Sequence, residues 1–440
     1  MREEVDILVK NITALDPASD TILHGVDIAV KNNRIVKIGQ RLKFDLVEEI
    51  EGGGKIAIPG LVDAHTHAFQ ILLRGALSMK ELQVHPIWLR VLIPFEAELT
   101  REEAEISVEL SCLNMIRKGI TSFADAGGPY PEILAEAALR SGLRALVTHS
   151  TMDRGPENYT RTVQMNRDLI QRYRNGRVRG SYSIRQIMTS SDQQIEETFR
   201  YARTDGVRVH MHLNEEVSEI QHALARWGLR PVEYLYSKGF LGDNVLAAHC
   251  AFLTGEEIRQ LSSSGTNIIH CPTIAMLYMN FPRIPELIAA GVNIALGSDG
   301  GSYRPIDLFM EMNIMISGLT GYYGTPYHDF NVITPRTALK AATYNGARVL
   351  GFKAGRLQED YLADIAIIDV QKPHLTPLHD PYLLPLYATG EDITDLIVDG
   401  KIIMKNSQPL TLDQEKIIQM VKEIQPQILE KIKSITRRQY

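Results

Sequence analysis

The sequence predicts an α/β protein built on a TIM-type (β/α)8 barrel. Two observations favour this fold. Short apolar segments rich in β-formers alternate with helical stretches over roughly 250 residues, the usual size of such a barrel. Histidine and carboxylate side chains also follow the ends of several of these segments. A doubly wound open sheet is the alternative, and the lack of a G-x-G-x-x-G after the first strand counts against dinucleotide binding.

Eight apolar runs are the expected barrel strands. They lie at 56–65, 119–125, 143–149, 177–184, 206–213, 244–250, 266–271 and 292–299. Helical stretches, such as residues 101–118 and 191–204, separate most of them. This alternation predicts a parallel sheet whose strands are joined by helices.

The two ends of the chain carry a different, alternating β pattern. It occupies residues 1–54 and returns at 363–370 and 395–406, where Asp399-Gly400 is a hairpin signal. We therefore expect one small β domain from residues 1–54 and 361–440, with a helix over 411–437, and a barrel over residues 55–360.

Composition excludes several classes of partner. The chain has 440 residues and a net charge of −6, without a basic block for nucleic acid. No apolar stretch reaches the roughly 18 residues of a membrane helix, and the N-terminus lacks a secretion signal. The three cysteines, Cys112, Cys250 and Cys271, lack disulfide-framework spacing. We expect a cytoplasmic protein with a small-molecule substrate, no nucleic acid and no membrane.

Residues able to bind a metal gather at predicted strand ends. His65 and His67 follow the first strand, His212 ends the fifth, His249 ends the sixth and Asp299 ends the eighth. The active site of a barrel lies at this end of its strands. Imidazole and carboxylate suit Zn²⁺ and other first-row divalent ions. We predict one metal held by His65, His67, His212 and Asp299, with a position left for water.

Two neighbouring residues are the candidates for proton transfer and charge stabilisation. Glu215, three residues after His212, is placed to carry protons, and His249 to hold the nucleophile or stabilise developing charge. His210 shares a face with His212 and is the alternative ligand, but His212 lies nearer the rim. The H-x-H pair alone also fits an ordinary turn; the gathering at one rim favours the metal site.

The remaining strand-end histidines and the positions of the lysines indicate how many metal ions to expect. His149 and His270 also end strands and are expected to be structural. No lysine occurs between Lys118 and Lys238, so a carboxylated lysine on the fourth strand cannot bridge two metals. One metal is therefore expected.

Four segments together resemble the amidohydrolase superfamily. They are "PGLVDAHTH", "HMHLNE", "AAHC" and "GVNIALGSDG", in the family's order and spacing. The resemblance covers nearly the whole chain and is strongest to the branch of methylthioadenosine/S-adenosylhomocysteine deaminases and triazine hydrolases. It implies a distorted barrel, a small β-sandwich made by both chain ends, and a hydrolytic metal centre with the four ligands named above.

The resemblance also implies a reaction. In that family a metal-bound hydroxide adds to an electron-poor ring carbon, and Glu215 matches the residue that protonates the ring nitrogen. His249 matches the histidine beside the metal-bound water, and Asp299 assists the loss of ammonia. The expected activity is therefore metal-dependent deamination of an aminated N-heterocycle such as a purine, pterin or triazine. The ligands suit Zn²⁺ or Fe²⁺ alike, and Zn²⁺ is the expected ion.

The expected substrate contacts are Glu215, Gln70, Arg185 and Gln186, and the sequence departs from the nucleoside-deaminating pattern in two places. Ile87 stands where those relatives have an acidic, ribose-binding residue, and Arg185 and Gln186 stand where they have a substrate-binding histidine. Gln70 resembles the triazine-hydrolase and oxopurine-deaminase pattern. The alternatives are a nucleoside deaminase, a dechlorinase, alkylamine hydrolase or cyclic amidase, and a non-enzymatic binding barrel. A homodimer or homotetramer is expected, as is common for relatives.

Overall fold

The barrel predicted from the sequence is present in the computed structural model, which describes residues 4–78, 86–155 and 159–438. Its strands pair in parallel, in the order β6-β7-β8-β9 and then β10-β11-β12-β13-β14. Their bounds are β6 Leu61–Thr66, β7 Ile120–Asp125, β8 Arg144–Val147, β9 Val178–Gly180, β10 Tyr182–Ile184, β11 Val209–Leu213, β12 Val245–His249, β13 Asn267–His270 and β14 Ile294–Leu296.

Two of the predicted strands are each divided in two. The run 56–65 breaks at Gly60, and its first half, β5 (Lys55–Pro59), pairs with strands of a different sheet. A Cβ at Gly60 would lie 2.2 Å from the Thr121 side chain, so only glycine fits this crossing. The run 177–184 breaks at Ser181, whose N–H donates to the carbonyl of Val147. Both halves of each run are largely buried, with Arg179 half-buried in β9, so the pattern alone does not reveal the break.

The barrel closes between its last and first strands by contacts outside a regular ladder. The N–H of Asp299 donates to the carbonyl of His65 at 3.0 Å. The N–H and hydroxyl of Ser298 donate to the Asp63 carboxylate at 2.9 and 2.5 Å. Closure therefore fixes Asp299 beside His65.

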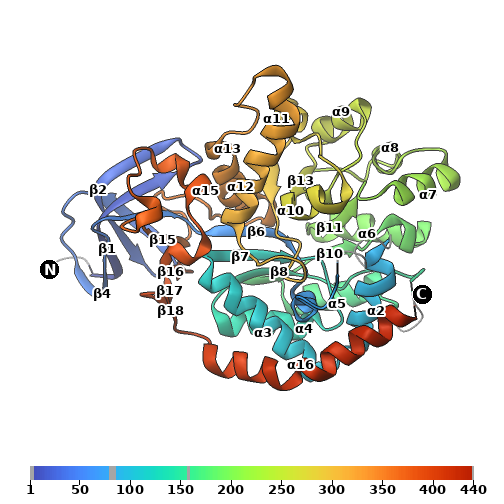
Figure 1. Ribbon diagram of the computed structural model, residues 1–440, viewed down its shortest axis with the longest axis horizontal. Helices are drawn as coiled ribbons and strands as arrows, with labels where there is room; N and C mark the ends of the chain where they lie inside the picture. The colour runs from blue at the N-terminus through green and yellow to red at the C-terminus, as the bar shows by residue number, and fades with distance from the viewer. Residues whose placement is uncertain (1–3, 79–85, 156–158, 439–440) are drawn as a thin grey trace.

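The chain ends together form the second sheet, on the left of Figure 1. Its order is β18-β17-β16-β15-β5-β1-β2-β3, with β4 paired to β1. The bounds are β1 Glu4–Asp16, β2 Thr21–Lys31, β3 Arg34–Gly39, β4 Asp45–Glu51, β15 Ile365–Asp369, β16 Ile393–Val398, β17 Lys401–Lys405 and β18 Gln408–Pro409. Asp399 and Gly400 both have positive φ, 53° and 73°, which confirms the predicted hairpin.

The sheet from the chain ends is the predicted β-sandwich. Strand β1 contributes to two apolar clusters, Ile7 and Val9 to one and Val5 and Leu8 to the other. The domain boundaries at 54/55 and 360/361 remain a prediction. Residues 1–3 and 439–440, at the ends of the predicted ranges, lie outside the described residues.

Helices surround the barrel and confirm the helical stretches predicted at 101–118 and 191–204. Their bounds are α2 Ile93–Glu98, α3 Arg101–Arg117, α4 Pro131–Ser141, α5 Val163–Arg172, α6 Asp192–Asp205, α7 Val217–Trp227, α8 Pro231–Ser237, α9 Gly255–Ser264, α10 Pro272–Ile274, α11 Ile284–Ala289, α12 Leu308–Leu319, α13 Pro335–Lys340, α14 Gly346–Leu350, α15 Leu384–Tyr387 and α16 Gln414–Arg437. Thr100 and Glu103 form a capping box that starts α3. The predicted helix at 411–437 is α16, which runs beneath α3 (Figure 1).

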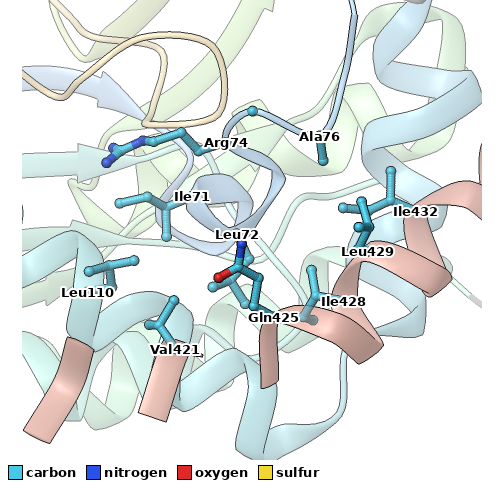
Figure 2. A pocket seen from close by; sticks show the side chains of 11 residues that line it. Ile71, Leu72, Arg74, Ala76, Leu110, Val421, Gln425, Ile428, Leu429 and Ile432 are labelled. Atoms are coloured by element: carbon cyan, nitrogen blue, oxygen red, sulfur yellow. The ribbon is translucent and has the colours of Figure 1, made fainter. Parts of the chain in front are cut away.

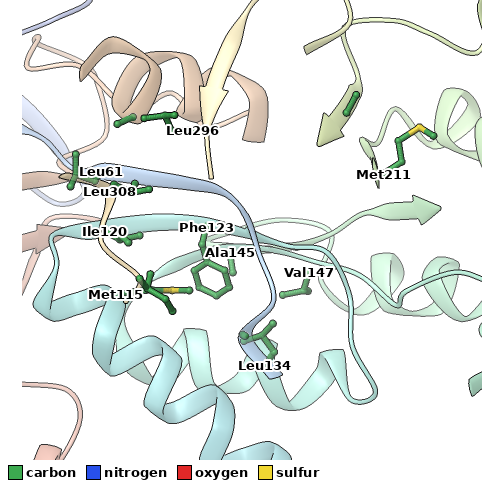
Figure 3. Packing of buried hydrophobic residues seen from close by; sticks show 14 of the residues in the cluster. Leu61, Met115, Ile120, Phe123, Leu134, Ala145, Val147, Met211, Leu296 and Leu308 are labelled. Carbon is green, nitrogen blue, oxygen red and sulfur yellow. The ribbon is translucent and has the colours of Figure 1, made fainter. Parts of the chain in front are cut away.

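The barrel strands bury their outward faces against this helical layer. Phe123 of β7 and Val147 of β8 lie in one cluster with Met115 of α3 and Leu134 of α4 (Figure 3). All four side chains are fully buried. Burial of each such side chain stabilises the fold by about 1.5–3 kcal/mol, so this layer holds the strands that carry the site. In the described residues, no helix is long and apolar enough to cross a membrane.

A buried arginine ties the barrel to the terminal sheet. Arg144 of β8 donates from Nε and Nη2 to Asp364, at 2.6 and 3.2 Å, and from Nη2 to Asp399 at 2.6 Å. The Arg144 side chain is 4% exposed and that of Asp364 is fully buried. Such a pair is held by fork geometry, which a lysine would not reproduce.

We expect Arg144→Met to lower the free energy of unfolding by about 3–5 kcal/mol, because it leaves a buried carboxylate without its cation. Arg172→Met is the control, since Arg172 pairs with Glu136 at an exposed site and such pairs contribute about 0–1 kcal/mol. Urea unfolding followed by circular dichroism measures both. A loss at Arg144 no larger than at Arg172 would contradict the expectation.

Candidate metal centre

Four side chains from separate strands converge at the C-terminal end of the barrel. They are His65 of β6, His212 of β11, His249 at the end of β12 and Asp299 after β14. One candidate ligand atom from each lies within 4.8 Å of the others. The three histidines are buried, and the Asp299 side chain is 13% exposed, so the group opens on the aspartate side.

His67, also predicted as a ligand, borders this group. Its Nε2 lies 3.3 Å from Nε2 of His212 and 3.4 Å from Oδ1 of Asp299. The same Asp299 oxygen lies 3.0 Å from Nε2 of His65. Tetrahedral ligands at about 2.0–2.1 Å from zinc are separated by about 3.3 Å, so these separations fit a metal. The structure thus brings the four predicted ligands together and adds His249.

Two residues of the group have a left-handed backbone. His249 has φ 71° and Asp299 has φ 59°, each just where its strand ends. Residues other than glycine adopt this region rarely and at an energetic cost. The conformation turns each side chain at the strand end, and strain of this kind concentrates at functional sites.

Burial keeps the histidines uncharged. It lowers the pKa of His249 to about 3, and burial together with the charge of neighbouring Arg185 lowers the pKa of His65 to about 3. Burial also lowers the pKa of His67 and His212 well below 6.5. Neutral imidazole is the form that gives a lone pair to a metal. The histidines are therefore in the ligand form at neutral pH.

Two further observations support a divalent metal ion at this group of histidines and Asp299. Both ring nitrogens of His249 are buried without a hydrogen-bond partner in the described structure. Buried polar atoms are normally paired, and an orphaned nitrogen facing a carboxylate is explained by an ion. Nitrogen and carboxylate oxygen ligands suit zinc and similar ions. A divalent metal is therefore supported at this place, whereas zinc and iron are not distinguished.

His210, the alternative ligand from the sequence, lies behind the group. Its Nε2 is 2.8 Å from Nδ1 of His65, on the side of the ring away from Asp299. A partner on the second nitrogen orients a ligand histidine and fixes its tautomer. His210 is thus placed to orient His65, and His212 is the residue in the converging group.

Glu215 lies at the edge of the group with its backbone and side chain both held. Nε2 of Gln186 donates to Oε2 of Glu215 at 2.7 Å, and the Glu215 N–H donates to Glu219 at 2.8 Å. Its Oε1 is 3.9 Å from Nε2 of His249. Burial and the charge of Glu216 raise the pKa of Glu215 well above 4.5. A carboxyl group with a raised pKa accepts and returns protons near neutral pH.

The other two predicted substrate contacts, Arg185 and Gln70, each contact a different neighbour. Nη1 of Arg185 is 3.2 Å from Nδ1 of His67. Nε2 of Gln70 donates to Glu96 at 2.6 Å, and the Tyr159 hydroxyl donates to the second Glu96 oxygen at 2.6 Å. No sequence pattern marks Glu96 or Tyr159 as part of the site. No spacing links these two residues to Gln70, and only the fold brings them together.

Of the remaining strand-end histidines, His270 is fully buried and His149 is half-buried. Desolvation lowers the pKa of His149 to about 4 and that of His270 to about 3. Ile87, at the position of the ribose-binding acid in nucleoside-deaminating relatives, is fully buried. Its side chain therefore brings no charge or hydrogen bond to the site.

A pocket of about 360 Å³ lies elsewhere, between α16, α3 and η1 (Ala68–Leu73), as Figure 2 shows. Its lining is mostly apolar and includes Leu110, Val421 and Ile428. Among the described residues that line it, Arg74 is the one charged residue and donates from Nε to the carbonyl of Gly301 at 2.9 Å. This pocket offers no base, nucleophile or ligand set, so the chemistry belongs to the histidine group.

Comparisons with known proteins agree with this site. The model of the amidohydrolase family matches residues 56–403. A 5'-deoxyadenosine deaminase of Methanocaldococcus jannaschii is 34% identical over 95% of this chain and 98% of its own length. A 5-methylthioadenosine/S-adenosylhomocysteine deaminase of Haloquadratum walsbyi is 33% identical over 85% of each chain.

Solved structures share the fold. An adenosine deaminase from Xanthomonas campestris with bound zinc has a TM-score of 0.90 at 24% identity, covering 97% of this chain and 99% of that one. The atrazine chlorohydrolase of Arthrobacter aurescens complexed with zinc has a TM-score of 0.87 at 23% identity, covering 96% and 100%. With the family model matched across the barrel and relatives similar over nearly the full length, the chain belongs to the amidohydrolase family.

Proposed function

We propose that this protein is a metal-dependent aminohydrolase that removes ammonia from an aminated N-heterocycle of the purine, pterin or triazine kind. The observation that carries the proposal is the convergence of neutral histidines and Asp299 beside a buried glutamate with a raised pKa. The names of the full-length relatives, which are deaminases of adenosine-type compounds, support the same reaction class. It is a hydrolysis of a carbon–nitrogen bond in a cyclic amidine.

One divalent ion would be held by His65, His67, His212 and Asp299, with His249 beside it. Zinc is the proposed ion, supported by the zinc in two structures of the same fold. When bound, such an ion acts as a Lewis acid and makes water nucleophilic near neutral pH.

The chain's own residues then handle the protons. Glu215 accepts a proton from the nucleophile and delivers it to the ring nitrogen next to the reacting carbon, as its raised pKa allows. Glu215 and Asp299 pass a second proton to the leaving amine. His249, uncharged and with Nε2 3.9 Å from Oε1 of Glu215, would hold the nucleophile by a hydrogen bond.

Three alternatives differ from the proposal in substrate, in product or in lacking a reaction. A nucleoside deaminase is favoured by the relatives' names, and it requires a ribosyl group on the substrate. A dechlorinase, alkylamine hydrolase or cyclic amidase would release chloride, an alkylamine or a ring-opened acid. A non-enzymatic barrel would lack ligands, and each expected ligand is present in this chain. A cytoplasmic location and a homodimer or homotetramer remain predictions.

The decisive experiment is an ammonia-release assay on zinc-loaded protein. The panel contains aminopurines, aminopterins, adenosine derivatives and amino- or chlorotriazines. Ammonia from at least one free heterocycle is expected, and a chelator should abolish it. Ammonia from ribosides alone would replace the proposal with the nucleoside alternative. Protein that neither contains nor takes up a first-row metal would contradict the proposal altogether.

We expect Gln186→Leu to lower kcat about tenfold with little change in KM, because Glu215 loses the hydrogen bond that fixes its carboxylate. Gln193→Leu is a matched control, since Gln193 lies exposed on α6 and contacts Glu197. Steady-state ammonia release measures both variants. A rise in KM with unchanged kcat would instead place Gln186 among substrate contacts, as the sequence alone suggests.

A further inference from the structure

A buried cation lies beside the metal ligands without a matching anion. Arg185 follows β10 (Tyr182–Ile184) and is 2% exposed. Within the described residues it forms no ion pair, and the one side-chain hydrogen bond of its guanidinium goes to His67 Nδ1. Its Nε is buried without a partner. Burying a guanidinium is costly unless an acceptor compensates it, so this cation calls for one.

The nearby carboxylates are already engaged by other groups. The Arg185 charge lowers the pKa of four of them, against the larger effect of burial: Glu96, Asp125, Glu215 and Asp299. Glu215 accepts from Gln186, and Asp299 lies against His65. Glu96 accepts from Gln70 and Tyr159, and Asp125 accepts from two backbone N–H groups. None of them is a direct partner for Arg185.

The contact with His67 depends on which ring nitrogen carries the proton. Nε2 of His67 faces His212 and Asp299, whereas Nδ1 faces Arg185. A neutral imidazole that gives its Nε2 lone pair to a metal carries its proton on Nδ1. Nδ1 then becomes a donor and no longer accepts from Arg185. With a metal bound, two donors 3.2 Å apart face each other, and an acceptor atom between them satisfies both.

We propose that the heterocycle this protein deaminates carries an exocyclic oxygen on its ring, an oxo group or its ionised form, that accepts hydrogen bonds from Arg185. The inference rests on the proposed function. Only the His67 ring separates Arg185 from the ligand group, so the acceptor belongs to the reacting heterocycle and not to a distant substituent. Guanidinium binds most strongly to oxygens that carry negative charge, which an oxo group conjugated to the ring provides.

Paired purines test this inference by direct binding. The first pair is adenine and 2-oxo-6-aminopurine, and the second is 2-aminopurine and guanine. Within each pair the two members differ only by the exocyclic oxygen. Calorimetry on zinc-loaded Glu215→Gln protein measures binding without turnover. We expect the oxygen-bearing member of at least one pair to bind about 10- to 100-fold more tightly, the range for a hydrogen bond to a charged group. Equal affinities within both pairs overturn the inference.

Variants of Arg185 identify the source of the preference. Arg185→Met should remove the preference while zinc content, measured by atomic absorption, stays at the level of the parent protein. Arg185→Lys keeps the charge and should retain part of the preference. Arg172→Met, at an exposed ion pair, should change nothing. Equal weakening of both members of a pair by Arg185→Met overturns the inference; should that variant not fold, the wild-type pairs and Arg185→Lys decide.

The two proposals fail in different ways. If no compound yields ammonia with wild-type protein but the oxygen-bearing purines still bind preferentially, the deaminase proposal fails and the role of Arg185 stands. If ammonia is released equally well from both members of each pair, the deaminase stands and the oxygen requirement fails.

Discussion

Replacing Glu215 with glutamine should abolish deamination, with kcat lowered by about 10²- to 10⁴-fold, the range for loss of a general acid–base group. The glutamine side chain still accepts the hydrogen bond from Gln186 but carries no proton between sites. Substrate binding and zinc content should stay close to those of the parent protein. Ammonia release and metal analysis of the purified variant measure the two effects.

Glu196→Gln provides the matched control for this change. Glu196 forms an exposed ion pair with Lys238, so its replacement should leave kcat unchanged. Retention of more than about a tenth of wild-type kcat by Glu215→Gln would remove Glu215 from proton transfer. Loss of zinc in that variant would instead point to a structural role.

The two histidines of "HMH" should differ in their effect on metal binding. His212→Ala should take the zinc out of the protein and abolish activity, because it deletes a nitrogen of the converging group. His210→Ala should still take up one zinc at saturation, with an affinity about 10- to 100-fold lower, because it removes only the partner that orients His65. Zinc titration with a competing chelator separates the two outcomes. The reverse order of effects would make His210 the ligand.

The barrel could be predicted because its pattern is repeated along the chain. Each strand is a short apolar run, and several of the helices between them begin at a capping residue, such as Thr100, Thr162, Ser191 and Thr254. Where apolar residues follow one another without interruption, the predicted strand bounds were wrong. The run that contains Gly60 serves two sheets, and every residue of it is apolar or buried in either setting.

The candidate site could be located from the sequence because barrel strands bring their C-terminal ends to one rim. The contacts between individual side chains in the site could not be predicted, because they depend on the directions of side chains across the barrel. Gln186, expected to contact substrate, donates to Glu215, and Arg185 faces His67. Glu96 lies 26 residues from Gln70 along the chain, and no periodicity relates the two.

At Gly60 the chain passes directly from the terminal sheet into the barrel, so the barrel depends structurally on the sheet made by the two chain ends. β5 is held between β1 and β15, and one residue later β6 begins and leads to His65. A chain that began at residue 55 would keep β5 but lose the strand on one of its sides. β5, which directly precedes the strand of His65, would then be unpaired on the side that β1 covers. Engineers who graft this barrel onto another protein should therefore carry both termini along with it.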